Sequence, residues 1–234
     1  MKTSIFLHIF YIAILSVSIG CYKENNTSLL EGTFFETEID TQLTYEYISE
    51  LNKINVYTEE FNDDISDWWM GNDDGFTAGI NQGLYQLYNG HGDNLRWLYG
   101  GFAIDPQSDF EFEAFIRISS SGDQDGAGIG IRDTEGNLLN FLLDDSNNAA
   151  VYSWNAGKEE FKTLLGWEEK YWIDSFHGTL LTIRKNENKY IFFADKKYIG
   201  YSTASNVITP DRITFFFKGS ASMEVDFVAL NYIH

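Results

Sequence analysis

The chain has 234 residues, of which 44% are hydrophobic and 17% are aromatic, so it can bury a core and is not a disordered chain. Its 35 acidic residues against 16 basic ones give a formal net charge of -19, and a surface of that sign repels nucleic acid and anionic lipid headgroups. The single cysteine excludes an internal disulfide and a thiolate cluster for zinc or iron–sulfur.

Residues 1–20 have the three-part plan of an export signal. One positive charge precedes the apolar run from Ile5 to Val17, which is too short to span a bilayer as a helix. Gly20 directly before Cys21 resembles the lipobox of bacterial lipoproteins. The resemblance implies cleavage before Cys21 and lipidation of that cysteine. The membrane is then a partner through the lipid anchor only.

Residues 21–55 follow as the lipidated cysteine and a polar, acidic tether. Tyr22 stands where an inner-membrane retention signal would have aspartate, and Lys23-Glu24 resembles the export tag of surface lipoproteins, although both can also be plain tether residues. The resemblance implies a bacterial outer-membrane location, with the cell surface as the further expectation. A short amphipathic helix before the domain is an alternative, favoured by the spacing of Tyr47, Ile48, Leu51 and Ile54.

From residue 56 to residue 234 the chain is a succession of strand-length segments separated by turn residues. We predict strands at Tyr57–Phe61, Thr77–Ile80, Leu84–Tyr88, Arg96–Tyr99, Phe110–Ile118, Ala127–Arg132, Leu138–Leu143, Ala149–Trp154, Phe161–Leu165, Leu180–Lys185, Tyr190–Ala194, Tyr198–Ser202, Arg212–Lys218 and Met223–Tyr232. Many short antiparallel strands predict an all-β fold, a two-sheet antiparallel β-sandwich formed by one domain. We expect Trp68 and Trp97 in its core.

The stretch from Asp109 to Arg132 organises this prediction. Apolar residues alternate through its first half and again at Ala127, Ile129 and Ile131, which predicts two strands with one core face. The opposite face of the second strand carries glycines beside Arg132. A face with so few side chains could receive a ligand, or the glycines could serve only to accommodate a crossing segment.

Several segments resemble domains of the concanavalin A-like lectin/glucanase superfamily, of the laminin-G and keto-disaccharide-hydrolase-like kind. They are the opening Glu60-Phe61-Asn62-Asp63 with Trp68, the Ala78 to Tyr85 hairpin, the two central strands, the hairpin from Thr179 to Gly200, and Val225 to Val228 at the end. The resemblance covers residues 56–234 and implies a jelly roll. It leaves the activity open, because this fold hosts lectins, hydrolases and interaction modules.

Glycoside hydrolysis needs two carboxylates that flank the scissile bond. In the glucanase branch they lie on one strand as E-x-D-x-x-E, and the nearest match here, Glu224 and Asp226, ends in Ala229. We expect these two acids on a solvated edge strand. Glu111 and Glu113 are expected to form surface ion pairs that contribute little. The sequence therefore favours a domain that is not an enzyme, with a glycoside hydrolase as the third-ranked alternative.

Sugar binding needs aromatic faces for the apolar side of a pyranose and planar polar groups for its hydroxyls. If residues 110–154 form a meander, Arg117, Arg132 and Asn140 lie on one face, with Tyr152 or Trp154 beside them. We therefore predict non-catalytic binding of a poly- or oligosaccharide through these five residues. The alternative is a structural or protein-interaction module at the cell envelope.

No cofactor is predicted, with calcium as the alternative for the acidic loops. Asp123 and Asp125 form the pair with the best claim to that ion, although turn chemistry explains such clusters equally well. The histidines are scattered and show no metal-ligand spacing.

Overall fold

The computed structural model describes residues 41–62, 68–92, 95–120, 122, 124–203 and 208–234. The predicted export signal, Cys21 and Asp123 lie outside the described residues. The described part is built from strands and three short 3-10 turns, and it contains no α-helix and no helix that could cross a membrane.

The 3-10 turns are η1 (Thr41–Leu43), η2 (Tyr45–Tyr47) and η3 (Glu50–Asn52). The strands are β1 (Lys53–Glu59), β2 (Gly71–Asp73), β3 (Phe76–Asn81), β4 (Leu84–Asn89), β5 (Leu95–Ala103), β6 (Asp109–Ser120), β7 (Gly126–Arg132), β8 (Leu138–Leu143), β9 (Asn148–Asn155), β10 (Glu160–Glu169), β11 (Thr179–Asn186), β12 (Lys189–Ala194), β13 (Lys197–Thr203), β14 (Arg212–Lys218) and β15 (Ala221–Ile233).

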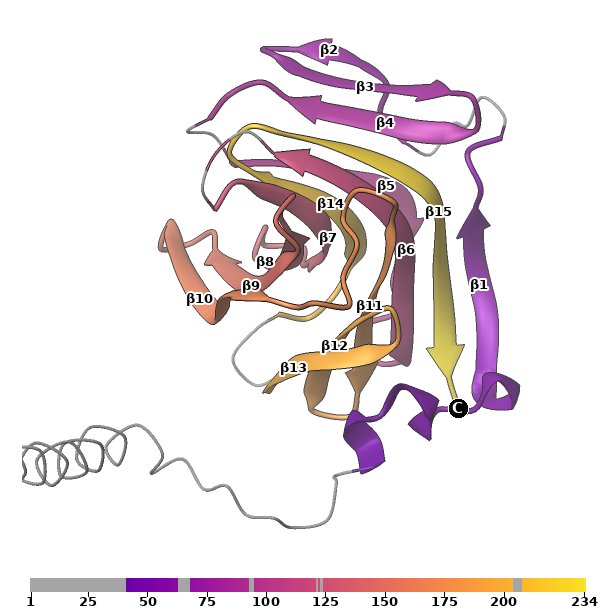
Figure 1. Ribbon diagram of the computed structural model, residues 1–234. Coiled ribbons are helices and arrows are strands. Elements are labelled where there is room, and N and C mark those ends of the chain that lie inside the picture. The colour runs from indigo at the N-terminus through magenta and orange to yellow at the C-terminus, as the bar shows by residue number, and fades with distance from the viewer. Residues whose placement is uncertain (1–40, 63–67, 93–94, 121, 123, 204–207) are drawn as a thin grey trace, which may run out of the picture. The chain divides into compact units, whose positions relative to one another are not determined.

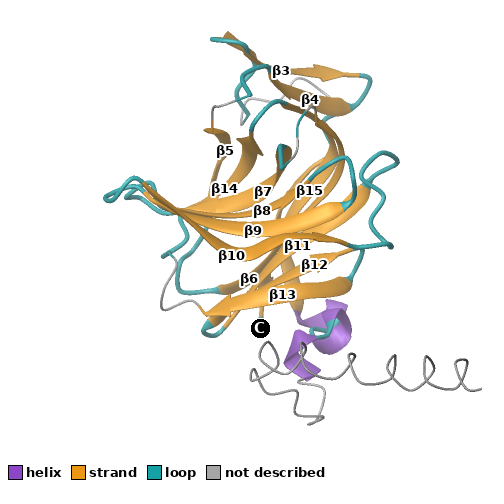
Figure 2. Ribbon diagram, turned by 60° about the vertical axis from the view of Figure 1, so that its left-hand side comes forward, coloured by secondary structure: helices purple, strands orange, loops and turns teal. Residues whose placement is uncertain are grey.

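These strands form two antiparallel sheets. Sheet A is nine-stranded in the order β13-β12-β11-β6-β15-β4-β3-β2, with β1 also paired to β15, and sheet B is six-stranded in the order β10-β9-β8-β7-β14-β5. Figure 1 shows sheet A curving around sheet B, and Figure 2 shows the strands of sheet B in their paired order. The predicted β-sandwich is confirmed. Only β2 was not predicted, because a strand of three residues is too short to show alternation.

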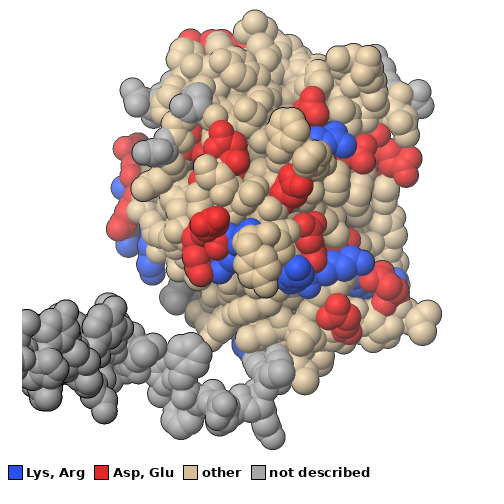
Figure 3. Space-filling model, viewed as in Figure 1, with Lys and Arg blue, Asp and Glu red and all other residues tan. Residues whose placement is uncertain are grey.

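The core lies between the sheets and follows the period-2 pattern of the sequence. Phe112 and Ile116 of β6 face Ile129 of β7 and Phe215 of β14, and all four side chains are fully buried. Trp68 is 3% exposed and stacks on Phe215 with ring centroids 4.7 Å apart, as expected of a core residue. On the face seen in Figure 3, acidic and basic side chains are interspersed.

The expectation that β6 and β7 lie in one sheet is wrong. β6 pairs with β11 and β15 in sheet A, while β7 pairs with β8 and β14 in sheet B. The chain between them crosses from one sheet to the other, so the two apolar faces meet across the core. Alternation identifies a core face but not the sheet that carries it.

The segment before β1 packs on the outer face of sheet A. Tyr45 is 7% exposed and forms a small cluster with Ile191 and Phe193 of β12. Leu51 is 95% exposed and Ile54 already belongs to β1, so the alternative of an amphipathic helix does not hold. Residues 41–52 therefore belong to the folded unit and pack on sheet A.

Sheet B is strongly curled. Phe161 of β10 stacks on Phe216 of β14 with ring centroids 6.1 Å apart, although β9, β8 and β7 lie between these strands in the sheet. In a flat sheet four strand spacings of roughly 4.8 Å would separate them by about 19 Å. The outer face of sheet B is therefore folded on itself around a second apolar cluster of Leu138, Leu142, Ala150, Tyr152 and Phe216.

Candidate functional site

The curl of sheet B brings four of the five predicted ligand-binding residues onto one face. In the strand register Asn140 lies opposite Tyr152, while Arg132 and Trp154 lie on either side of Leu138. The predicted meander is therefore real for β7 to β10. Arg117 is not part of it, because β6 belongs to sheet A.

This face is closed rather than bare. Asn140 is 0% exposed and Tyr152 is 5% exposed. A Cβ at Gly130 would lie 2.7 Å from Thr214 Oγ1, and a Cβ at Gly126 would lie 2.8 Å from the Trp167 ring. The glycines therefore permit the close approach of neighbouring groups, which favours the second of the two alternatives that the sequence left open.

Five of the six strands of sheet B carry no acidic side chain. They are β5, β7, β8, β9 and β14. The polar atoms of the Asn140 amide and Thr214 Oγ1 are buried and have no hydrogen-bond partner among the described residues. These five strands hold two polar groups away from water and supply no carboxylate. The acids on the strands of sheet B lie on β10, and the Asp144–Asp145 turn lines a separate hollow of about 520 Å³ with Trp167.

A second location is the outer face of sheet A, where β4, β15 and β6 lie side by side. Gln86, Glu224 and Arg117 form one row across the three strands. They line a hollow of about 620 Å³, called the Glu224 hollow below. Because β15 lies between β4 and β6, the prediction that Glu224 is on a solvated edge strand is wrong.

Both oxygens of the Glu224 carboxylate are held. Gln86 Nε2 donates to Oε1 at 2.9 Å, and Arg117 Nη1 lies 3.5 Å from Oε2. The Glu224 side chain is 39% exposed, so it remains open to solvent. Tyr88 and Phe176 add aromatic rings to the lining and are 48% and 76% exposed. The hollow thus combines an oriented carboxylate with exposed ring faces.

The loop at residues 174–178 fixes one side of the hollow. Arg117 Nε donates to the carbonyl oxygen of His177 at 3.1 Å. The ring of His177 lies 2.8 Å from Asp174 Oδ2, and the bonds from the backbone and ring of His177 lower the pKa of the Asp174 carboxyl. Phe176 lies between Asp174 and His177 in the chain. The loop therefore provides both the carbonyl oxygen that Arg117 contacts and an aromatic ring.

A second carboxylate follows Glu224 on the same strand. Asp226 is exposed, and the register of β15 against β6 shifts between Val225 and Phe227. Such a bulge leaves the extra residue outside the ladder and turns its side chain outward. Of these residues, the sequence singled out Glu224, Asp226 and Arg117. It gave no signal for Gln86, because the alternation of apolar residues along a strand does not predict which strand it pairs with.

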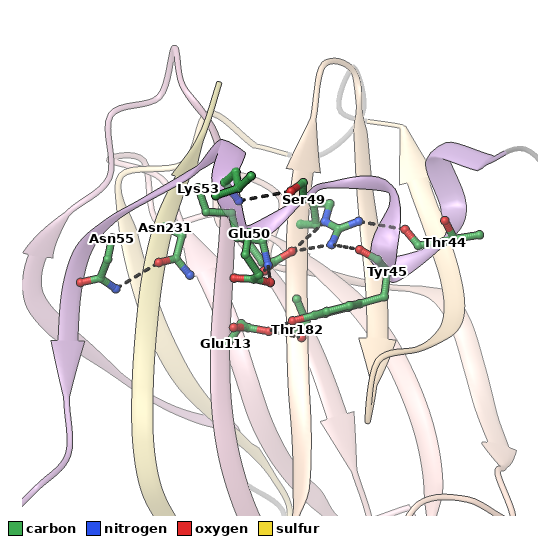
Figure 4. A network of polar contacts seen from close by, with 12 residues as sticks. Thr44, Tyr45, Ser49, Glu50, Lys53, Asn55, Glu113, Thr182 and Asn231 are labelled. Carbon is green, nitrogen blue, oxygen red and sulfur yellow. Dashed lines mark hydrogen bonds and ion pairs between the residues drawn. The ribbon is translucent and has the colours of Figure 1, made fainter.

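The prediction that Glu111 and Glu113 form surface ion pairs is wrong. Glu111 is fully buried and accepts a hydrogen bond from Arg184 Nε at 2.8 Å. Its Oε2 also forms an ion pair with Arg184 Nη2 at 2.6 Å, and the carboxylate pairs with Lys53. Figure 4 shows this network beneath the segment that carries Tyr45. The segment covers the outer face that sequence alternation assigned to water.

Glu113 belongs to the same network. The Tyr45 hydroxyl donates to Glu113 Oε1 at 2.7 Å and the Thr182 hydroxyl at 3.1 Å. Burial, followed by the neighbouring charge of Glu111, raises the pKa of the Glu113 carboxyl. Two carboxyl groups in such different surroundings are a signature of acid–base sites. The Glu224 hollow does not include them, and their hydrogen bonds fix the N-terminal segment to the sheet.

The acidic side chains in the loops accept hydrogen bonds from backbone N–H groups of turns. Asp125 accepts from the backbone of Ser220 at 3.1 Å, and Asp144 accepts from the backbones of Ser146 and Asn148. Over the described ranges no three histidine, cysteine, aspartate or glutamate side chains gather as metal ligands would. The calcium alternative for Asp125 thus gains no support from its neighbours.

The fold agrees with known structures. An endo-acting O-glycanase of human gut microbiota matches with a TM-score of 0.57 and 11% identity, over 77% of this chain and all (100%) of that one. The endo-1,3-β-glucanase (laminarinase) catalytic domain of Thermotoga petrophila RKU-1 matches with a TM-score of 0.56 and 9% identity, over 77% and 98%. The chain has the concanavalin A-like jelly-roll fold.

A third match is a β-1,3-1,4-glucanase (lichenase) from a mouse hindgut metagenome, with a TM-score of 0.56 and 9% identity over 76% of this chain and 98% of that one. No protein-family model and no curated protein matches the sequence. All three structures are of glycan-cleaving enzymes, which contradicts the prediction of a non-catalytic function. At these identities the likeness establishes the fold alone.

Proposed function

We propose that the chain is a glycoside hydrolase that cleaves a polysaccharide in the Glu224 hollow. The observation that carries this proposal is a partly exposed carboxylate, held by Gln86 and Arg117, in a hollow lined with exposed aromatic rings. The glycan-cleaving enzymes that share the fold support a polysaccharide as substrate.

The reaction needs one carboxyl group that protonates the leaving oxygen and a second that attacks the anomeric carbon or activates a water molecule. Glu224 and Asp226 are two residues apart on β15, where the strand bulges between Val225 and Phe227. Asp226 is exposed and is the next acid along the strand after the one that lines the hollow. We assign attack or water activation to Glu224, because two neighbours fix its orientation, and proton donation to Asp226.

The remaining groups of the hollow position the substrate. Tyr88 and Phe176 offer ring faces to the apolar side of a pyranose, and Gln86 offers an amide to its hydroxyls. Arg117 connects the carboxylate to the loop that carries Phe176, so binding at the aromatic ring and orientation of Glu224 are linked.

The test is the release of reducing ends from a panel of polysaccharides by the purified full-length chain. Glu224→Gln keeps the hydrogen bond from Gln86 within reach and removes the charge, and it should lower turnover at least about a hundredfold. Asp226→Asn should do the same. Glu160→Gln, an exposed position on β10, is the matched control and should change nothing. Wild-type turnover in Glu224→Gln, or no turnover of any polymer by the native chain, contradicts the proposal.

We further propose that the chain is anchored to the bacterial outer membrane through a lipid on Cys21. The support is the export-signal pattern of residues 1–20 and Gly20 directly before the cysteine. An envelope location would bring a hydrolase to polymers too large to enter a cell.

A further inference from the structure

A second hollow, of about 420 Å³, lies where the β2–β3 hairpin of sheet A meets the edge strand β5 of sheet B. Its aromatic side chains come from Trp69, Phe76, Trp97 and Tyr99, and Arg96 and Asp73 contribute charged groups. We call it the Trp97 groove. It shares no residue with the Glu224 hollow.

Three of the four aromatic side chains of the groove are open to solvent, while Phe76 is 5% exposed. Trp69 is 38% exposed, Trp97 42% and Tyr99 48%. The expectation that Trp97 lies in the core is therefore wrong. β5 is an edge strand, and the side chains of Trp97 and Tyr99 project from it on the same side because they are two residues apart.

The walls of the groove are fixed in place. Arg96 Nη2 lies 2.8 Å from Asp74 Oδ2, which ties β5 to the turn of the β2–β3 hairpin. The Arg132 guanidinium lies 5.0 Å from the Tyr99 ring centroid. The ring of Trp69 packs against Gly71, where a Cβ would lie 3.1 Å from Cζ2. Rigid aromatic faces lose little entropy when a ligand stacks on them.

We propose that the Trp97 groove binds the substrate polysaccharide outside the hydrolytic site, and that this polymer is uncharged. Half-exposed indole and phenol faces match the apolar face of a pyranose, while Arg96 and Asp73 match its hydroxyls. A formal net charge of -19 opposes an acidic polymer. A protein partner would need roughly 800 Å² of matching surface on each side, whereas the groove is a hollow of about 420 Å³ lined by seven residues.

This inference rests on the proposed function for the identity of the ligand, but it is tested by binding. The probe is a soluble neutral β-glucan, added to the full-length chain carrying Glu224→Gln so that no turnover occurs, and followed by tryptophan fluorescence and affinity electrophoresis. Trp97→Ala and Tyr99→Ala should each weaken binding about tenfold, since each removes one stacking face. Tyr201→Ala is the matched control, because Tyr201 is 46% exposed on β13, outside the groove.

A polyuronic acid of similar length should bind at least about tenfold more weakly than the neutral polymer because of charge repulsion. Unchanged affinity in both Trp97→Ala and Tyr99→Ala overturns the inference, as does equal affinity for the neutral and the acidic polymer. If Glu224→Gln abolishes turnover while the groove variants bind normally, polysaccharide binding in the groove is refuted and the proposed hydrolytic site is supported. If the groove variants weaken binding while Glu224→Gln retains full turnover, polysaccharide binding in the groove is supported and hydrolysis at Glu224 is refuted.

Discussion

Replacement of Glu111 by glutamine should destabilise the sandwich severely. The carboxylate accepts charged hydrogen bonds from Arg184 Nε and from Lys53 and forms an ion pair with Arg184 Nη2. The side chains of these cations are only 0% and 4% exposed. Charged hydrogen bonds contribute at least about 1.5 kcal/mol each, and breaking a buried ion pair typically costs about 3–5 kcal/mol. We expect the free energy of unfolding to fall by about 4 kcal/mol, because Arg184 stays buried without a counter-charge.

The assay is denaturant unfolding of Glu111→Gln at neutral pH, with the midpoint compared at constant slope. Glu168→Gln is the control, because Glu168 pairs with Lys170 at 2.7 Å but its side chain is 72% exposed. That change should cost less than about 0.5 kcal/mol. A double-mutant cycle with Arg184→Gln should return a coupling of at least about 2 kcal/mol. A loss of unfolding free energy below about 1 kcal/mol in Glu111→Gln would refute the reasoning, because about 1 kcal/mol is the most that a solvent-exposed ion pair contributes.

The other predictions concern charge, packing and the anchor. The raised pKa of Glu113 means that the folded chain holds a proton which the unfolded chain has lost, so stability should fall as pH rises from the ordinary glutamate range through the raised pKa. Glu113→Gln keeps an acceptor for Tyr45 and should flatten that part of a stability–pH curve; an unchanged slope contradicts this. Gly128→Ala places a Cβ against the backbone of β8, 2.9 Å from Leu142 Cα, and should lower the unfolding free energy by about 3 kcal/mol in the same denaturant assay. Cys21→Ser should move the chain from the membrane fraction to the soluble fraction of a bacterial host, and an unchanged distribution would refute the lipid anchor.

The strands of this sandwich could be predicted because their cause is local. Apolar alternation along β6 and β14 fixes which residues face the core, and the turns between strands carry the residues that turns require. Strand partners have no such local cause. β4 pairs with β15 although Gln86 and Glu224 are far apart in sequence, so the row that forms the Glu224 hollow could not be predicted.

The burial of Glu111 and Glu113 could not be predicted for the same reason, because it depends on contacts between distant segments. Glu111 and Glu113 alternate with core residues, which indicates a face open to water. That face is covered by residues 41–52, whose apolar spacing indicates a helix and gives no sign that the segment packs on a sheet. Burial of these acids follows from a segment docking on the sheet, and the contacts that hold it run from Arg184 to the backbone oxygens of Thr44 and Tyr45 at 3.0 and 2.7 Å. Such contacts to backbone atoms leave no trace in side-chain patterns.

The curl of sheet B decides which face can carry chemistry. Burial of Phe216 and Leu142 stabilises the curl by about 1.5–3 kcal/mol for each side chain. The unpartnered amide of Asn140 and hydroxyl of Thr214 oppose it by about 1–3 kcal/mol each. The aromatic side chains of Tyr152 and Trp167 add to the apolar term, so the closed face is the stable one. A polymer could reach this face only by displacing that cluster, and would then meet no carboxylate along β7, β8 or β9. The proposed hydrolysis therefore fits sheet A better, where the Glu224 carboxylate is partly exposed and held by two neighbours.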